Sequence, residues 1–202
     1  MVAATDIVTV SEASAYLQAP ADTALVELWI SAVSNRLDDL CGPVVARTVT
    51  DSLTACDGSV ILTSTPIYSI TSVTEYTGTT AQVLTLATNA SQPTTGYHLN
   101  TANGILSRRS GSGAANFPSG TKNIEVVYSA GRYASTATVT ERFKRACLIA
   151  VSHVVQSDHG TRNQTFGGFT DEGVATFGPG WVIPRRALDL LGNELIARIG
   201  IA

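Results

Sequence analysis

The chain has 202 residues, of which 44% are hydrophobic and 14% are charged, so it is long enough to bury the core of one ordinary domain. Its formal net charge is −3, and its basic pairs, 108–109 and 185–186, are too short to follow a phosphate backbone. These features disfavour sequence-independent binding to DNA.

The apolar segments argue against a membrane protein. The longest fully apolar run, residues 146–151, is far shorter than a membrane span. The first ten residues have no Lys or Arg ahead of their apolar positions and no long apolar core, so we expect no signal peptide. We therefore expect a protein that is made in the cytosol and does not contact a membrane.

Two helices are predicted at the start of the chain. Residues 11–18 form a short first helix, and Pro20 separates it from a longer one with Asp22 as N-cap. Gly42 and Pro43 end the longer helix, because glycine adopts the left-handed C-cap conformation and proline cannot continue a helix. Spacings of four, four, four and three predict that this helix buries Leu25, Trp29, Val33, Leu37 and Leu40.

From residue 44 the apolar period falls to two, which predicts strands. Residues 45–50 and 60–62 are predicted to form a hairpin around an Asp-Gly turn. Turns at Thr77-Gly78 and Asn103-Gly104, and a Gly- and Ser-rich loop over residues 110–120, separate the further strands. Those strands are expected at 67–76, 83–86, 97–99, 105–106 and 124–128. This number of short strands predicts an antiparallel barrel or a small sandwich.

The strand at 67–76 raises a question of phase. Ile67, Ile70 and Val73 recur every third residue, whereas a regular strand sends odd and even positions to opposite faces. Two explanations are open at this point. Either both faces of the strand are covered, or a bulge next to Ser69 resets the phase.

Helix is predicted again after residue 131. Thr138 and Glu141 form a predicted capping box, and the helix that follows buries a stripe of Phe143, Cys147, Ala150 and Val154. The apolar run 146–151 predicts that the middle of this helix is covered on several sides. Residues 161–180 form a Gly-rich loop that is too long for a simple connector, and a last helix begins at Pro184.

The residue types reveal no catalytic, cofactor or metal site. His153 and His159 lie six residues apart, on different faces of a helix, which does not suit a zinc pair, and His98 is interpreted as a surface histidine. No Walker, Rossmann or G-x-S-x-G pattern is present. The cysteines form no C-x-x-C pair and are interpreted as small buried hydrophobic residues: Cys41, Cys56 and Cys147. We therefore expect no cofactor, no metal and no enzymatic activity.

These elements predict an α+β fold in which a helical bundle carries an inserted antiparallel β-barrel or sandwich-like subdomain. Four segments are expected. Residues 1–43 supply the N-terminal helices of the bundle, 44–131 the β insertion and 132–160 the core helix. Residues 161–202 supply a flexible loop and a C-terminal docking helix.

Three stretches, taken in their order, carry a resemblance: SVILTSTPIYSITSVTEY, YHLNTANGILSRRSG and NIEVVYSAGRYASTATVTERFKRACLIAVSHVV. Over residues 13–155 the order of helices, Gly-Pro stop, β insertion and capped helix resembles the head-tail connector (adaptor) proteins of long-tailed bacteriophages, the ring beneath the portal. In that family a Tyr-x-Ala-Gly-Tyr-like ending precedes the core helix. Here Arg132 intervenes in YSAGRY.

The resemblance implies a virion structural protein. Copies would form a ring of twelve in the neck, attached to the portal protein on one side and to tail-completion or other neck proteins on the other. DNA would pass through the lumen without specific recognition, and the protein would be made in the cytoplasm of the host bacterium. Two alternatives stay open: another neck, tail-completion or fibre-base protein, and, with less support, a small enzyme or ligand-binding barrel.

The C-terminal region supplies a hypothesis for partner docking. Aromatic residues in a glycine-rich loop can anchor a protein interface, and the alternative is that they cover the core of their own subunit. The predicted docking residues are Phe166, Phe169, Phe177, Trp181, Arg185 and Arg186.

Overall fold

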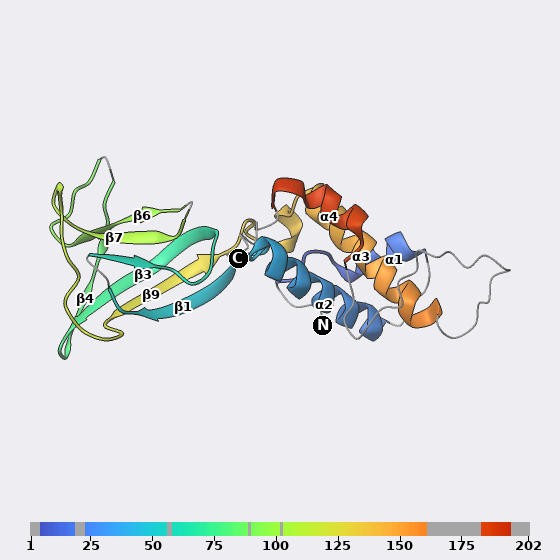
Figure 1. Cartoon of the computed structure of the whole chain (residues 1–202), viewed down its shortest axis with the longest axis horizontal. Coiled ribbons are helices and arrows are strands. Elements are labelled where there is room, and N and C mark those ends of the chain that lie inside the picture. The colour runs from blue at the N-terminus through green and yellow to red at the C-terminus, as the bar shows by residue number, and fades with distance from the viewer. Residues whose placement is uncertain are drawn as a thin grey trace, which may run out of the picture. The chain divides into compact units, whose positions relative to one another are not determined.

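The computed structural model describes residues 5–18, 23–55, 58–88, 90–101, 103–160 and 183–194, and the chain divides into two compact units (Figure 1). The helical unit comprises Met1–Cys41 and Ser135–Ala202, and the β unit comprises Gly42–Ala134. The β unit is therefore inserted into the chain of the helical unit. Helices in one unit and mainly antiparallel sheets in the other confirm the predicted α+β fold class.

The helical unit contains four α-helices and two 3₁₀ turns within the part of the chain that the structure describes. They are α1 (Val10–Leu17), α2 (Thr23–Cys41), η1 (Thr136–Thr138), α3 (Glu141–Gly160), α4 (Arg185–Leu191) and η2 (Gly192–Glu194). A capping box begins α1, because the Thr9 hydroxyl accepts the Glu12 amide at 3.2 Å and the Glu12 carboxylate accepts the Thr9 amide at 2.7 Å. The predicted N-cap of α2, Asp22, lies outside the described residues.

The buried face of α2 differs from the predicted one at its first turn. Val26 and Ile30 are fully buried, while Leu25 is 41% exposed and Leu28 is 63% exposed. Each step of four residues advances about 40° around a helix. A stripe traced back in such steps therefore drifts off the buried face by the time it reaches Leu25. The prediction for Leu25 was wrong, whereas Trp29, Val33 and Leu37 are buried as expected.

The helix α3 begins at Glu141 without the predicted capping box. The Thr138 hydroxyl donates to the Ser135 carbonyl at 2.9 Å and accepts the Ser135 amide at 3.2 Å, so the 3₁₀ turn η1 uses the group that was expected to cap α3. The helix contacts α1, α2 and α4, as expected for a core helix. Its buried residues are Phe143, Ala146, Cys147, Ala150 and Val151.

The β unit contains two sheets. The first has the order β1-β9-β3-β4, and the second has the order β2-β7-β6-β5, with β8 also pairing with β7. Every pair is antiparallel except β5 and β6, which are parallel. The strands are β1 (Arg47–Leu53), β2 (Ser59–Ile61), β3 (Ile67–Thr77), β4 (Thr80–Val83), β5 (Thr85–Leu86), β6 (Gly96–Asn100), β7 (Ile105–Ser110), β8 (Gly113–Ala114) and β9 (Ile124–Ala130).

Two predicted turns are present, and one predicted hairpin is not. Gly78, at φ +60°, lies in the turn between β3 and β4, and Gly104, at φ +68°, lies in the turn between β6 and β7. In contrast, β1 pairs with β9 and β2 pairs with β7. The predicted pairing of residues 45–50 with 60–62 was therefore wrong. The strands β1 and β2 belong to different sheets, because β9 is in the first sheet and β7 is in the second.

Bulges in β3 explain its period of three. Ile67, Ile70 and Val73 lie opposite Ala130, Tyr128 and Val126 of β9, and the register shifts once between each successive pair. Because of each shift, a step of three residues along β3 corresponds to a step of two residues along β9. The side chains of all three residues therefore lie on the same face of the sheet. Each packs against one apolar cluster. The bulge explanation is confirmed, and β3 needs no second apolar face.

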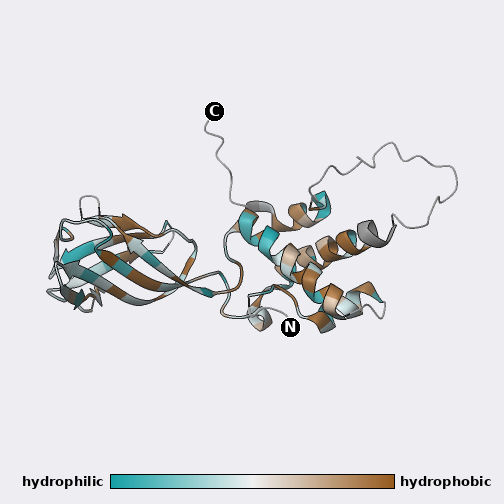
Figure 2. Cartoon of the chain, turned by 90° about the horizontal axis from the view of Figure 1, so that it is seen from below, coloured by the Kyte–Doolittle hydropathy of each residue, from teal (hydrophilic) through white to brown (hydrophobic). Residues whose placement is uncertain are grey.

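Both sheets contribute to one apolar core in the β unit, and Figure 2 shows the alternation of hydrophobic and hydrophilic residues along the strands. This alternation follows from the two-residue repeat of side chains in a strand. The core consists of Val60, Leu62, Ile67, Val73, Leu84, Tyr97, Leu106, Phe117, Ile124, Val126, Tyr128 and Ala130. The fold is therefore sandwich-like, as expected.

Candidate functional site

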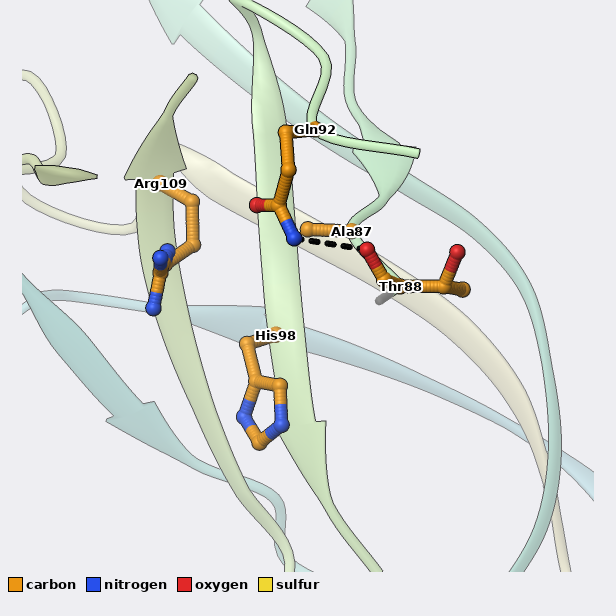
Figure 3. A pocket seen from close by; sticks show the side chains of 5 residues that line it. All are labelled: Ala87, Thr88, Gln92, His98 and Arg109. Atoms are coloured by element: carbon orange, nitrogen blue, oxygen red, sulfur yellow. Dashed lines mark hydrogen bonds between the residues drawn. The ribbon is translucent and has the colours of Figure 1, made fainter. Parts of the chain in front are cut away.

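A polar pocket with a volume of about 370 Å³ opens on the second sheet of the β unit (Figure 3). His98 comes from β6 and Arg109 from β7, and the remaining residues come from the segment between β5 and β6. The lining residues are Ala87, Thr88, Gln92, His98 and Arg109. Figure 3 shows the guanidinium, the imidazole and the Gln92 amide around the same space.

The alternation of β7 separates two neighbouring arginines. Arg108 points into the unit, where Nε and Nη2 donate to the two carboxylate oxygens of Glu75 at 2.9 and 3.0 Å. Arg109 is on the opposite face of the strand and lines the pocket. On β6, Gly96 pairs with Arg109 and His98 pairs with Ser107. His98 is therefore a diagonal neighbour of Arg109 on the same face of the sheet.

The partner of Arg109 in β6 has to be a glycine. A Cβ atom at Gly96 would lie 2.7 Å from Cγ of Pro93 and 2.9 Å from the carbonyl oxygen of Thr85. Both distances are shorter than real Cβ contacts, so a side chain would displace the β5 backbone or the segment before β6. Pro93 and the Thr85 carbonyl therefore fill the space that a side chain at this position would need.

A small turn holds the other wall of the pocket. Thr88 and Ser91 exchange two backbone hydrogen bonds, at 2.8 and 3.1 Å, and the Ser91 amide also donates to the Thr88 hydroxyl at 3.1 Å. The Gln92 side-chain amide donates to the Thr88 carbonyl at 2.6 Å. This bond orients the amide of Gln92 at the pocket (Figure 3).

The pocket carries positive charge without a matching acid. Arg109 Nη2 donates to the Ser112 carbonyl at 2.6 Å, but the buried Nε of the same side chain has no hydrogen-bond partner within the described part of the chain. None of the five lining residues is acidic. Such an arrangement can bind an anion. Among the described residues no group of three or more His, Cys, Asp or Glu is placed to hold a metal ion.

Sequence reasoning missed this pocket. His98 was interpreted as a surface histidine, and Arg109 was considered only as part of a basic pair. The available signal was the two-residue period, which separates Arg108 from Arg109, combined with the Asn103-Gly104 turn, which brings β6 and β7 together. The turn from residue 88 to residue 91 had no comparable signal.

The predicted docking residues lie apart from the pocket in the sequence. Arg185 and Arg186 begin α4 and are exposed, and the side chains of Ile183, Ala187 and Leu191 are buried in the helical unit. The aromatic members of the prediction lie outside the described residues: Phe166, Phe169, Phe177 and Trp181. The docking role of all six residues stays a prediction.

Cys41 and Cys147 are buried free thiols, as expected, and Cys56 lies outside the described residues. Burial raises the pKa of the Cys147 thiol to about 12, although a hydrogen bond with Ser34 acts in the opposite direction. The thiol is therefore protonated and unreactive at neutral pH. Within the described ranges, no helix is both long enough and apolar enough to span a membrane.

No protein-family model matches the chain, and no curated protein matches it. Among solved structures, one match is a chain of a structure described as the neck of an empty GTA particle computed with C6 symmetry. Its TM-score is 0.66 at 14% identity, and the alignment covers 100% of this chain and 96% of that one. Identities this low show a shared fold.

Two further matches come from native GTA particles. A chain from the neck computed with C12 symmetry has a TM-score of 0.53 at 16% identity, with 84% of this chain and 88% of that chain covered. A chain from the virion of the native gene transfer agent particle has a TM-score of 0.55 at 15% identity, with 81% and 84% covered. The fold of this chain is therefore shared with components of these particles.

Proposed function

We propose that the protein is a structural subunit of the neck of a tailed phage or phage-like particle, where copies form a ring that connects head and tail. The observation that carries this proposal is the likeness over 100% of the chain to a chain from a particle neck. The connector-like landmarks at residues 13–155 support the same role independently. The C6 and C12 symmetries of the matching neck structures favour a ring.

The finer proposal is a twelve-membered connector ring with the portal protein on one side and tail-completion or neck proteins on the other. DNA passes through its lumen without being recognised. A net charge of −3 and the lack of a basic run suit such a channel, because a wall rich in Lys and Arg would hold the phosphates. The protein acts by assembly and carries out no chemical reaction.

Electron microscopy of native particles from the producing cells, labelled with an antibody against this chain, tests the proposal. We expect label only between capsid and tail. Label elsewhere on the virion would contradict the neck assignment and indicate a fibre-base or other structural role. A complete lack of label on particles would favour a small enzyme or binding barrel.

The same experiment tests docking through the C-terminal region. Deleting residues 161–202 would also remove Ile183, Ala187 and Leu191, which are buried in the helical unit, so substitution is the sharper test. Alanine at Phe169, Phe177 and Trp181 is expected to remove the label from the neck while the far-ultraviolet circular dichroism stays unchanged. Normal labelling of particles by this variant would contradict the docking role.

A further inference from the structure

We propose that the pocket of the β unit binds the carboxylate of an acidic side chain supplied by a second copy of the chain. The pocket would then be a contact between adjacent subunits of the ring, so the choice of a second copy rests on the proposed function. The carboxylate chemistry of the pocket rests only on the geometry of the β unit.

The first argument is the convergence of donors. The guanidinium of Arg109, the imidazole of His98 and the amide of Gln92 surround one space (Figure 3). The guanidinium offers only donors and the imidazole at least one, whereas the Gln92 amide nitrogen already donates to the Thr88 carbonyl, so the donors come from Arg109 and His98. The acidic residue that would normally neutralise the arginine is not among the lining residues.

The second argument is the incomplete bonding of Arg109. The Arg109 side chain makes one hydrogen bond in the described part of the chain, from Nη2 to the Ser112 carbonyl, and its buried Nε has no partner there. Buried polar atoms are nearly always paired, and leaving a donor unpaired costs about 1–3 kcal/mol. An acceptor that arrives from outside the subunit would meet the terminal guanidinium N–H groups, of which only Nη2 has a bond in the described residues, and Nε would pair only after the side chain shifts.

The third argument distinguishes a carboxylate from a phosphate. The pocket has a single arginine, and its planar guanidinium matches a planar carboxylate with two parallel hydrogen bonds. A phosphate group carries up to two charges and is usually held by several cations or by a series of backbone amides. The lining residues include no lysine and no second arginine.

The fourth argument identifies the source of the carboxylate. A pocket of about 370 Å³ has room for the stem of a side chain as well as its charged end. The side chains of Thr88, Gln92 and His98 are exposed, so the space is open to a group that enters from solvent. Each copy has 16 acidic residues against 13 basic ones, so a second copy can supply a carboxylate and has a net charge opposite to that of the pocket.

Nuclear magnetic resonance tests the chemistry of the pocket in the full chain, with glutarate as a probe for an acidic side chain. We expect glutarate to cause saturable shifts of the His98 ring signals. Arg109→Gln should weaken this response about tenfold or more, because it removes a charge-assisted contact, and Arg109→Lys should weaken it less. Lys122→Gln, which changes an exposed lysine of the same unit outside the pocket, should bind as the wild type does.

Three outcomes would overturn the pocket assignment. They are no saturable shift, an equal shift with sodium chloride at the same ionic strength, and tighter binding of inorganic phosphate than of glutarate. The last outcome would assign the pocket to a phosphate instead.

Analytical ultracentrifugation at matched concentrations tests the second copy as the source. Arg109→Gln is expected to raise the concentration needed for ring formation about tenfold, and Lys122→Gln is expected to leave it unchanged. Rings that form equally well with Arg109→Gln would overturn the subunit contact while glutarate binding could still stand. A wild type that never forms rings would contradict the proposed function, and with it the second copy as occupant.

Discussion

In the β unit a guanidinium and a carboxylate are sealed between two sheets, whereas in the helical unit the comparable ion pair lies near the surface of two helices. The Arg108 and Glu75 side chains are 9% and 5% exposed, and the Lys144 and Glu12 side chains are 13% and 34% exposed. Both pairs are short, with Nε–Oε2 at 2.9 Å and Nζ–Oε1 at 2.6 Å. The donor–acceptor distance alone therefore does not predict which pair contributes more to stability.

Their contributions to stability differ because burial changes what remains when one partner is lost. An exposed charge that loses its partner is solvated again, while a buried one is left without water or counter-charge. The β unit also seals a second carboxylate, Asp51, which accepts hydrogen bonds from the Tyr128 hydroxyl at 2.9 Å and the Thr63 amide at 2.8 Å. The loss of a polar partner should therefore cost more at these buried carboxylates than at the partly exposed Glu12.

The largest expected effect is that of Arg108→Leu. It leaves the Glu75 carboxylate buried and unpaired, and the free energy of unfolding of the β unit should fall by about 3–5 kcal/mol. Urea titration followed by circular dichroism measures this change. Arg109→Gln, on the opposite face of the same strand, should cost about 0.5 kcal/mol or less.

A second variant separates the charge from the packing. Replacing both Glu75 and Arg108 by leucine should restore much of the lost stability, because no unpaired charge remains. A double variant as unstable as the single one would show that the pair is needed for the shape of the core and that its charges are secondary.

Tyr128→Phe should have an intermediate effect. The residue is fully buried, and its hydroxyl donates to Asp51 and accepts the Ser64 amide at 3.0 Å. Removing the hydroxyl leaves both groups short of a partner, at a cost of about 1–3 kcal/mol in the same titration. Tyr68→Phe is the control, since Tyr68 is 53% exposed. Equal stability of the two variants would refute the role of this network.

The smallest effect is expected in the helical unit, from Lys144→Met. Burial by itself raises the pKa of Glu12, but hydrogen bonds from Lys144 and from Thr9 outweigh it, so the pKa lies below its usual value. The pair is partly exposed, so the variant should lose only about 0.2–1 kcal/mol at pH 7.

The sign of the pH dependence follows from the lowered pKa of Glu12. A carboxylate whose pKa is lower in the folded state stabilises the fold above the pKa of the unfolded chain, about 4.3 for Glu. This contribution is lost as the pH falls through the lower, folded-state value. The stability difference between wild type and Lys144→Met should therefore vanish in acid, as unfolding titrations at pH 7 and below pH 4 would show. A difference that persists in acid would mean that the lysine acts through its aliphatic stem.

Local patterns succeeded where one element determines its own structure. Apolar spacing placed α2 and α3, and glycines in positive-φ turns marked the ends of β3 and β6. The predictions were wrong where the same residue was compatible with two different local structures. Thr138 could cap α3 or close η1, and Leu25 could begin the apolar stripe or lie beside it. For Thr138, two hydrogen bonds with Ser135 close η1, and for Leu25, the helix places Val26 and Ile30 on the buried face instead.

The sequence by itself determined the α+β class and the period-two strands, because propensity and side-chain period act over a few residues. Only the tertiary structure decided that β1 and β2 enter different sheets and that two bulges against β9 align Ile67, Ile70 and Val73. These outcomes depend on contacts between residues far apart in the chain. Such contacts are selected by burial in a shared core and leave no local pattern in the sequence.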